Sequence, residues 1–246
     1  YRSPSAGRNL LRCGILGGER IEIAAGHLLQ AVGSTLMTLK IVAAILLLVA
    51  SLTACGEEES SSTKPDGGTM QWDAPPEMTI DTDTEYLVTV ETTHGTMSGR
   101  LFPDAAPHAV NNFVFLAKQG YFDGLVVHRI VKGFVLQSGD PTGTGTGGPG
   151  YTIEEDPIPS DLNYVKGTFA MANKGTPGSG GSQFFITLDD LTGRLPKQYA
   201  LFGVLDEGLD TVDKINDVET NVGPSGEKSS PADDVRILKV TVEERS

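Results

Sequence analysis

From Tyr86 onward the chain is divided into short runs of β-forming residues that end at glycine or proline. The run that begins at Tyr86 alternates β-branched with polar residues, and His94-Gly95 is typical of a hairpin turn into the next run, Thr96–Phe102. Many short strands of this kind are typical of an antiparallel barrel. Further strands are expected at 126–130, 134–137, 168–172, 184–188 and 235–243.

Two stretches show helical periodicity instead. Pro107 suits the first turn of a helix, and Gly120 is a typical helix end. The apolar residues between them that share one face are Val110, Phe113, Val114, Leu116 and Ala117. A second helix is expected at 209–218. Many strands with two helices predict a mainly β fold, in which a closed antiparallel barrel is capped at its ends.

The composition excludes several classes of protein. The formal net charge of −13 disfavours nucleic-acid binding, which requires a basic surface. Two cysteines cannot build a disulfide-dense scaffold or a four-thiolate zinc site, and the four histidines are scattered. We therefore expect no metal, no cofactor and no nucleic-acid partner.

The N-terminal region has the features of a secretion signal. Met37 is followed by Lys40 and by the apolar run Ile41–Ala50. A basic start, a short apolar stretch and small residues before a cleavage site are typical of such signals. The following Leu52-Thr-Ala-Cys55 resembles a bacterial lipobox, whose cysteine is lipidated and becomes the mature N-terminus. An uncleaved signal anchor is the alternative, but the apolar run is shorter than the roughly 20 residues of a membrane span.

These features divide the chain into four expected segments. Residues 1–36 are expected to be an extension upstream of the true start, and residues 37–54 a lipoprotein signal peptide. The acidic and glycine-rich stretch 55–84 predicts a flexible tether, because it offers little apolar surface to order it. Residues 85–246 are expected to form one folded domain. The other cysteine lies upstream of Cys55, so no disulfide is expected in the mature chain.

Two glycine-rich segments match catalytic patterns whose context is missing. Gly143-Thr-Gly-Thr-Gly-Gly148 fits the dinucleotide pattern G-x-G-x-x-G, but Pro149-Gly150 follows where a helix must begin. Ser179 and Ser182 stand among glycines, but neither lies in a G-x-S-x-G motif between a strand and a helix. Neither a pyrophosphate site nor a serine nucleophile is expected.

Several longer motifs are more informative. A segment from His128 to Asp140 reads His-Arg-Ile-Val-Lys-Gly-Phe-Val-Leu-Gln-Ser-Gly-Asp, and Phe-Ala-Met-Ala-Asn-Lys follows at 169–174. Gly-Ser-Gln-Phe-Phe-Ile at 181–186 and Leu-Phe-Gly-Val at 201–204 complete the series. Together with the predicted helix that begins at Pro107, these motifs closely resemble the cyclophilin family of peptidyl-prolyl cis/trans isomerases. The resemblance extends from about Glu85 to Glu243.

The resemblance implies a closed eight-stranded antiparallel β-barrel with two capping α-helices and a peptide groove on one side. Within that groove a proline pocket would be walled by aromatic and aliphatic side chains, Gln137 would support the arginine, and Asn173 would hold the peptide backbone. The residues implied for catalysis are Arg129, Phe134, Gln137 and Phe185. The residues implied for substrate binding are Val135, Ala172, Asn173, Lys174, Gln183, Leu195 and Tyr199.

The chain departs from the eukaryotic pattern of this family at three positions. Val135 stands where a methionine is usual, Arg194 falls near a familiar tryptophan, and Tyr199 replaces a common histidine. These departures are expected to affect the affinity for ligands more than catalysis.

On this resemblance we expect a peptidyl-prolyl isomerase that acts on exported proteins and assists their folding. Proline-containing polypeptides are its expected partners, and the protein is expected to be a monomer. It would be anchored to the membrane by lipid on Cys55 and face the extracytoplasmic side of the cell envelope. The alternative on the same fold is a non-catalytic chaperone module that binds proline-containing peptides.

Overall fold

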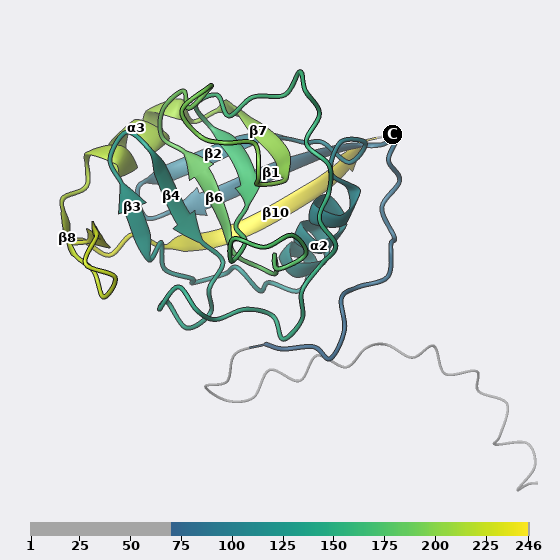
Figure 1. The fold of residues 1–246 in the computed structure, drawn as a ribbon, viewed down its shortest axis with the longest axis horizontal. Helices are drawn as coiled ribbons and strands as arrows, with labels where there is room; N and C mark the ends of the chain where they lie inside the picture. Colours follow the sequence, from purple (N-terminus) through teal and green to yellow (C-terminus); the bar gives the residue numbers. More distant parts are fainter. Residues whose placement is uncertain (1–69, 246) are drawn as a thin grey trace, which may run out of the picture. The chain divides into compact units, whose positions relative to one another are not determined.

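A computed structural model of the chain describes residues 70–245, which fold around one strongly curled sheet of eight strands (Figure 1). The strands follow one another in the order β10-β1-β2-β7-β5-β6-β4-β3, and every neighbouring pair is antiparallel. A separate hairpin is formed by β8 and β9. The strands are β1 (Glu85–Thr92), β2 (Gly95–Leu101), β3 (Arg129–Val131), β4 (Val135–Ser138), β5 (Thr168–Met171), β6 (Phe184–Thr187), β7 (Leu201–Glu207), β8 (Thr220–Val222), β9 (Lys228–Pro231) and β10 (Ile237–Arg245).

The sheet is open, so the prediction of a closed barrel is wrong. The edge strands β10 and β3 are not paired with each other; the segment that precedes β3 lies beside β10 instead. The N–H of Gly124 donates to the carbonyl of Ile237, and the N–H of Val127 donates to that of Val235, each at 2.8 Å. Only residues 124–127 lie beside the start of β10, and β3, which begins at Arg129, does not pair with it, so the sheet forms an open half-barrel.

Two helices, α2 (Pro107–Lys118) and α3 (Leu209–Asp217), lie at opposite ends of the curled sheet (Figure 1). Both predicted helices are confirmed, and α2 begins at proline as expected. Its first turn is capped from outside by the buried carboxylate of Asp156, which accepts hydrogen bonds from the N–H groups of His108 and Ala109 at 3.0 and 2.7 Å. A carboxylate at this position satisfies unpaired donors and favours the positive end of the helix dipole.

Apolar side chains pack on both faces of the central strands. Inside the curl, Phe113 of α2 stacks on Phe122 with ring centroids 4.9 Å apart and meets Phe184 edge-on at 5.4 Å. Outside the curl, a smaller cluster forms over β4 to β7. All four residues of β5 and all four of β6 are buried in consequence. The buried members of the outer cluster are Val135, Tyr164, Ala170, Phe185, Leu191 and Leu201.

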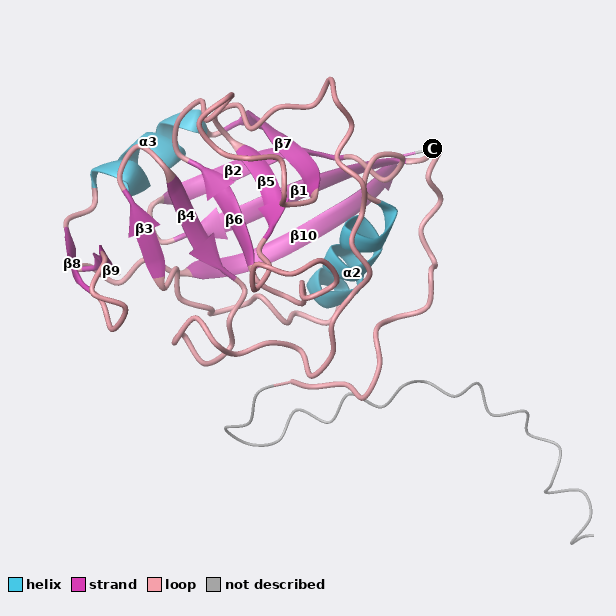
Figure 2. Cartoon of the chain, in the orientation of Figure 1, coloured by secondary structure: helices cyan, strands magenta, loops and turns pink. Residues whose placement is uncertain are grey.

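Loops surround the sheet (Figure 2), and the longest of those described, residues 139–167, joins β4 to β5. It begins around the fully buried Asp140, which accepts hydrogen bonds from the N–H groups of Thr142, Gly145 and Gly147 at 2.7, 2.6 and 3.1 Å. Burial alone would raise the pKa of Asp140, but these hydrogen bonds outweigh it and lower that pKa. The amides of the glycine-rich segment therefore face a carboxylate of their own chain, and no helix follows it, as expected.

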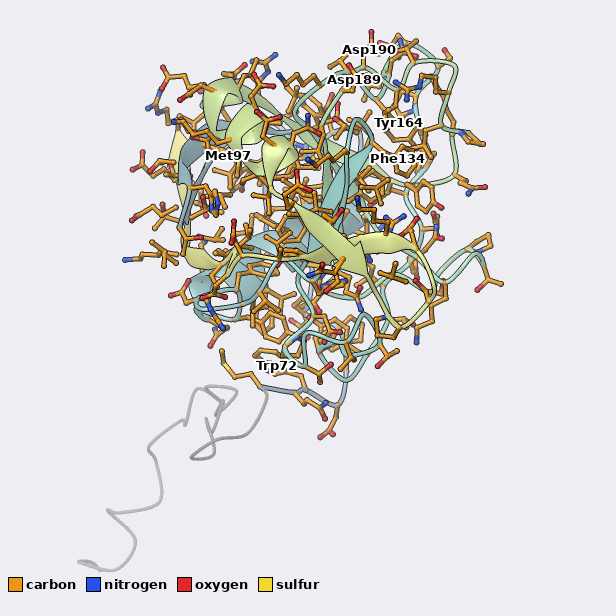
Figure 3. All side chains as sticks on the ribbon, turned by 90° about the vertical axis from the view of Figure 1, so that its left-hand side faces the viewer. Trp72, Met97, Phe134, Tyr164, Asp189 and Asp190 are labelled. Carbon is orange, nitrogen blue, oxygen red and sulfur yellow. The ribbon has the colours of Figure 1, made fainter. Side chains whose placement is uncertain are left out.

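Residues 70–84, the last part of the predicted tether, lie against the domain. The N–H of Trp72 donates to the carbonyl of Pro149 at 2.8 Å, and its ring meets that of Phe115 edge-on at 5.2 Å. Farther along, Asn111 of α2 accepts a hydrogen bond from the N–H of Thr79 at 2.9 Å. Trp72 supplies the apolar surface by which this otherwise polar stretch packs on the domain. Figure 3 shows Trp72 at one end of the domain.

The remaining predicted segments, residues 1–36, the signal 37–54 and the tether up to residue 69 with Cys55, lie outside the described residues. Within residues 70–245, no helix is long and apolar enough to cross a membrane.

Candidate active site

The outer cluster opens into a pocket of about 140 Å³. Its lining comes from strands β3, β4 and β6, from the β3–β4 turn and from the loops that follow β5 and β6. Every residue of this lining was implied by the family resemblance. They are Arg129, Phe134, Val135, Gln137, Ala172, Asn173, Phe185, Leu195 and Tyr199.

The register of the sheet explains why residues so far apart in the chain meet here. Arg129 on β3 pairs with Gln137 on β4, Gln137 pairs with Phe185 on β6, and Phe185 pairs with Ala170 on β5. Directly paired residues project from the same face of a sheet. One row across four strands therefore carries a cation, an amide and an aromatic ring onto the outer face.

The wall of the pocket is apolar. Phe185 is 5% exposed and meets the ring of Tyr199 edge-on at 5.3 Å. Beneath them, the buried Tyr164 accepts a hydrogen bond from the N–H of Tyr199 at 3.1 Å and donates one to its carbonyl at 2.8 Å. Tyr164 therefore fixes the backbone of a pocket residue, a role that the motifs did not indicate. Figure 3 shows Phe134 and Tyr164 on the same side of the domain, at the other end from Trp72.

Arg129 supplies the positive charge at the rim of the pocket. Its side chain is 28% exposed, and its guanidinium carbon lies 6.0 Å from the centre of the Phe134 ring. Nε and Nη2 donate to the two carboxylate oxygens of Glu227 at 2.7 and 3.0 Å, and Nη1 has no hydrogen-bond partner within residues 70–245. The hydrogen bond from Arg129 lowers the pKa of Glu227.

Gln137 does not support the arginine in the way that was predicted. Its Nε2 donates to Oε1 of Gln183 at 2.9 Å, whereas the arginine is held by Glu227. A carboxylate is a stronger acceptor for a guanidinium than an amide oxygen, which explains the difference.

A second hollow of about 640 Å³ adjoins the pocket, and Gln137 lines both. Lys174 and Gln183, predicted to bind substrate, lie in this second hollow and not in the apolar pocket. Gln183 is held there by a hydrogen bond from its Nε2 to the carbonyl of Gly147 at 2.9 Å. Gln71, from the N-terminal segment, forms part of the same lining.

The side chain of Asn173 is engaged by its own loop and by the loop that follows β6. Its Nδ2 donates to the carbonyl of Gln198 at 2.8 Å, and its Oδ1 accepts the N–H of Gly175 at 3.0 Å. Its main-chain N–H and C=O have no partner within the described part of the chain. The groups of Asn173 that can meet a peptide are therefore those of its backbone.

Arg194 is exposed beside the pocket and does not line it. It forms an ion pair with Asp189 at 2.9 Å and donates to the carbonyl of Gly133 at 3.3 Å. Between residues 70 and 245, no group of three or more His, Cys, Asp and Glu side chains is placed to hold a metal ion.

Comparison with known proteins identifies the family and the fold. The family model for cyclophilin type peptidyl-prolyl cis-trans isomerases matches residues 87–242. The chain belongs to the cyclophilin family. It is 39% identical over 161 residues to the peptidyl-prolyl cis-trans isomerase cypE of Dictyostelium discoideum, which covers 64% of this chain and 98% of that protein.

A bacterial cyclophilin and a solved structure give similar results. A peptidyl-prolyl cis-trans isomerase of Helicobacter pylori is 43% identical over 129 residues, or 52% of this chain and 78% of that one. A crystal structure of a cyclophilin type isomerase from Cryptosporidium parvum superimposes with a TM-score of 0.59 at 32% identity, covering 66% of this chain and 99% of that chain. The chain spans only 24% of the length of two other curated relatives.

Proposed function

We propose that the domain catalyses cis/trans isomerisation of X-Pro peptide bonds. The observation that carries this proposal is the position of Arg129, which lines an apolar pocket large enough for a pyrrolidine ring and has an unpaired Nη1 within the described residues. Members of the family are named for this activity, and the Cryptosporidium relative was also crystallised in the presence of the dipeptide Ala-Pro.

The chemistry requires rotation about an amide bond and no bond cleavage. Rotation removes the double-bond character of the C–N bond, over a barrier of about 18–20 kcal/mol. In the twisted transition state the prolyl nitrogen holds a free lone pair, which a guanidinium stabilises more than it stabilises the planar ground state. A guanidinium is a cation that presents its donors in a fixed plane.

The apolar wall contributes in two ways. Phe134, Phe185 and Leu195 would hold the proline ring while the preceding carbonyl rotates, and the bound ring would displace water from the pocket beside the arginine. An electrostatic interaction is stronger where water is excluded. Reducing a reaction time of tens of seconds to about a millisecond requires a 10⁴–10⁵-fold acceleration, or about 5.5–7 kcal/mol. One oriented cation beside a dry pocket can supply an effect of this size.

The test is an isomerisation assay on a short proline peptide, with protease-coupled detection, in the presence and absence of the full chain. Catalysis should appear and should be lost in Arg129→Ala. If the protein binds proline peptides without accelerating their isomerisation, it is the non-catalytic chaperone module that the sequence analysis left open.

We further propose that the protein is a monomer tethered to a membrane through a lipid on Cys55, where it assists the folding of exported proteins. The support is the sequence alone: an apolar run that ends in Leu-Thr-Ala-Cys, followed by an acidic stretch. One acyl chain binds a membrane marginally, whereas two or three anchor it stably. Mass spectrometry of the membrane-extracted protein should find a modified N-terminal Cys55. An unmodified cysteine preceded by residues 37–54 would contradict this anchor.

A further inference from the structure

Glu227 approaches the catalytic arginine from outside the motifs that identify the family. It lies in the turn between β8 and β9, a hairpin that belongs to a separate two-stranded sheet. Its two carboxylate oxygens accept from Nε and Nη2 of Arg129 at 2.7 and 3.0 Å. Of the charged groups described in the structure, this carboxylate is the one that pairs with Arg129.

The geometry of the pair matters more than its charge. Two parallel hydrogen bonds to one edge of a guanidinium fix the orientation of its plane, which a single bond does not. An arginine has five N–H donors, and this arrangement uses one edge and leaves Nη1 unpaired. A free arginine must give up side-chain entropy when it is ordered against a substrate, and an arginine that is already held avoids part of this loss.

The turn that carries Glu227 is itself constrained. Gly223 donates its N–H to the carbonyl of Glu227 at 2.8 Å, and Gly226, at a φ of +80°, donates to the carbonyl of Gly223 at 3.0 Å. The segment that enters the hairpin is attached to the β3–β4 turn, where the N–H of Gly133 donates to Oδ1 of Asn216 at 2.8 Å. The carboxylate is therefore presented from a closed turn that is fixed to the same strands as Arg129.

We propose that Glu227 is a positioning residue, which holds the guanidinium of Arg129 so that Nη1 faces the prolyl nitrogen of a bound peptide. The proposal rests on the isomerase function argued above. The pair is partly exposed, with side chains 28% and 40% accessible, so water screens the carboxylate and the arginine keeps its effective charge toward the pocket. If the carboxylate of Glu227 instead competed with substrate for the arginine, removing it would leave kcat unchanged or raise it.

Glu227→Gln and Glu227→Ala in the full chain test the proposal, with Glu219→Gln as the matched control. Glu219 lies at the base of the same hairpin and pairs with a lysine away from the pocket, so this control removes one equal charge. The rate and affinity are measured separately by NMR exchange on a proline tetrapeptide. We expect kcat to fall about tenfold in Glu227→Ala, less in Glu227→Gln, and KM to change little. The control should stay within about twofold of the wild type.

A second measurement detects the contact itself. The Nε–H signal of Arg129 should exchange slowly with water in the wild type and in Glu219→Gln, and quickly in Glu227→Ala, at an unchanged unfolding temperature. A kcat that is unchanged or raised in both Glu227 variants, in an active wild-type background, overturns the positioning role alone. A wild-type protein without isomerase activity overturns the proposed function, and the positioning role with it.

Discussion

The carboxylate of Asp156 accepts a 2.7 Å hydrogen bond from the N–H of Ala109, 47 residues earlier in the chain. The loop that follows β4 thereby caps helix α2, whose own N-cap residue is an alanine without a capping side chain. The cap joins the long loop that borders the site to the helix that packs inside the sheet.

Asp156→Ala should therefore destabilise the domain. The change removes a buried acceptor of two backbone N–H groups at a helix N-terminus, which predicts a loss of about 2–3 kcal/mol in unfolding free energy. Denaturant unfolding measures it. Glu154→Ala is the control, because Glu154 has a side chain that is 84% exposed and reaches the same His108 only at 3.4 Å. Equal effects of the two changes would show that the cap contributes little.

Arg129→Ala should lower kcat/KM by about 10²–10³-fold, by analogy with the loss of a preorganised donor. The fold should remain, because the side chain lies at the rim of the pocket and not in the core. Arg129→Lys should restore little, since an ammonium lacks the planar arrangement of donors. The measurements are the peptide assay and circular dichroism. Full activity in a folded Arg129→Ala variant would disprove the arginine mechanism.

Trp72→Ala should release the N-terminal segment from the domain. The ring packs against three aromatic side chains, so its loss should cost about 2 kcal/mol in unfolding free energy. Protease cleavage between residues 70 and 84 should become faster. Met78→Ala, a change at a side chain that is 49% exposed in the same segment, should have neither effect. Unchanged cleavage in Trp72→Ala would mean that hydrogen bonds such as the one from Thr79 to Asn111 hold the segment alone.

Asp140 should make stability depend on pH in the acid range. Because its pKa is lower in the folded state than in the unfolded chain, its contribution is complete above about 3.9, the ordinary value, and is lost as pH falls through the folded pKa. Asp140→Asn should reduce the unfolding free energy by about 2–3 kcal/mol at pH 7, and the difference should shrink in acid. Urea titrations from pH 7 to pH 3 measure this difference, with the exposed Asp161→Asn as the control. A difference that does not vary with pH would contradict the assignment.

The protein should bind cyclosporin weakly. In the cyclophilin family a groove tryptophan donates its indole N–H to this ligand, but the only tryptophan of this chain, Trp72, lies at the other end of the domain from Phe134 (Figure 3). A lost hydrogen bond of about 1–3 kcal/mol and a lost ring contact predict a loss of about a hundredfold in affinity. Isothermal titration decides the matter, and nanomolar binding would show that another residue supplies the contact.

Most of the lining of the pocket could be predicted from the sequence because its residues lie in long, ordered motifs; Leu195 and Tyr199 lie outside them and follow only from the alignment with the family. The helices could also be predicted. For the first helix, Pro107 is a local signal of its start and Gly120 of its end. Strand β7 was noted only as a motif, and the short strands β8 and β9 were not predicted. These two strands are short and mostly polar, with no clear period of two, and a glycine-rich turn joins them, so the hairpin that holds Glu227 gave no local signal of strands.

The sequence by itself therefore determined both helices, most strands of the large sheet and the side chains expected to line the pocket, because short-range patterns and motifs encode them. The tertiary structure decided which distant groups meet: Asp156 with the first turn of α2, Trp72 with Phe115, and Glu227 with Arg129. The open sheet is also a result of the tertiary structure, because the segment 124–127 and the start of β10 meet only in the folded chain. Glu227 and Arg129 are 98 residues apart in the chain, so their contact depends on the whole fold and produces no signal in local periodicity.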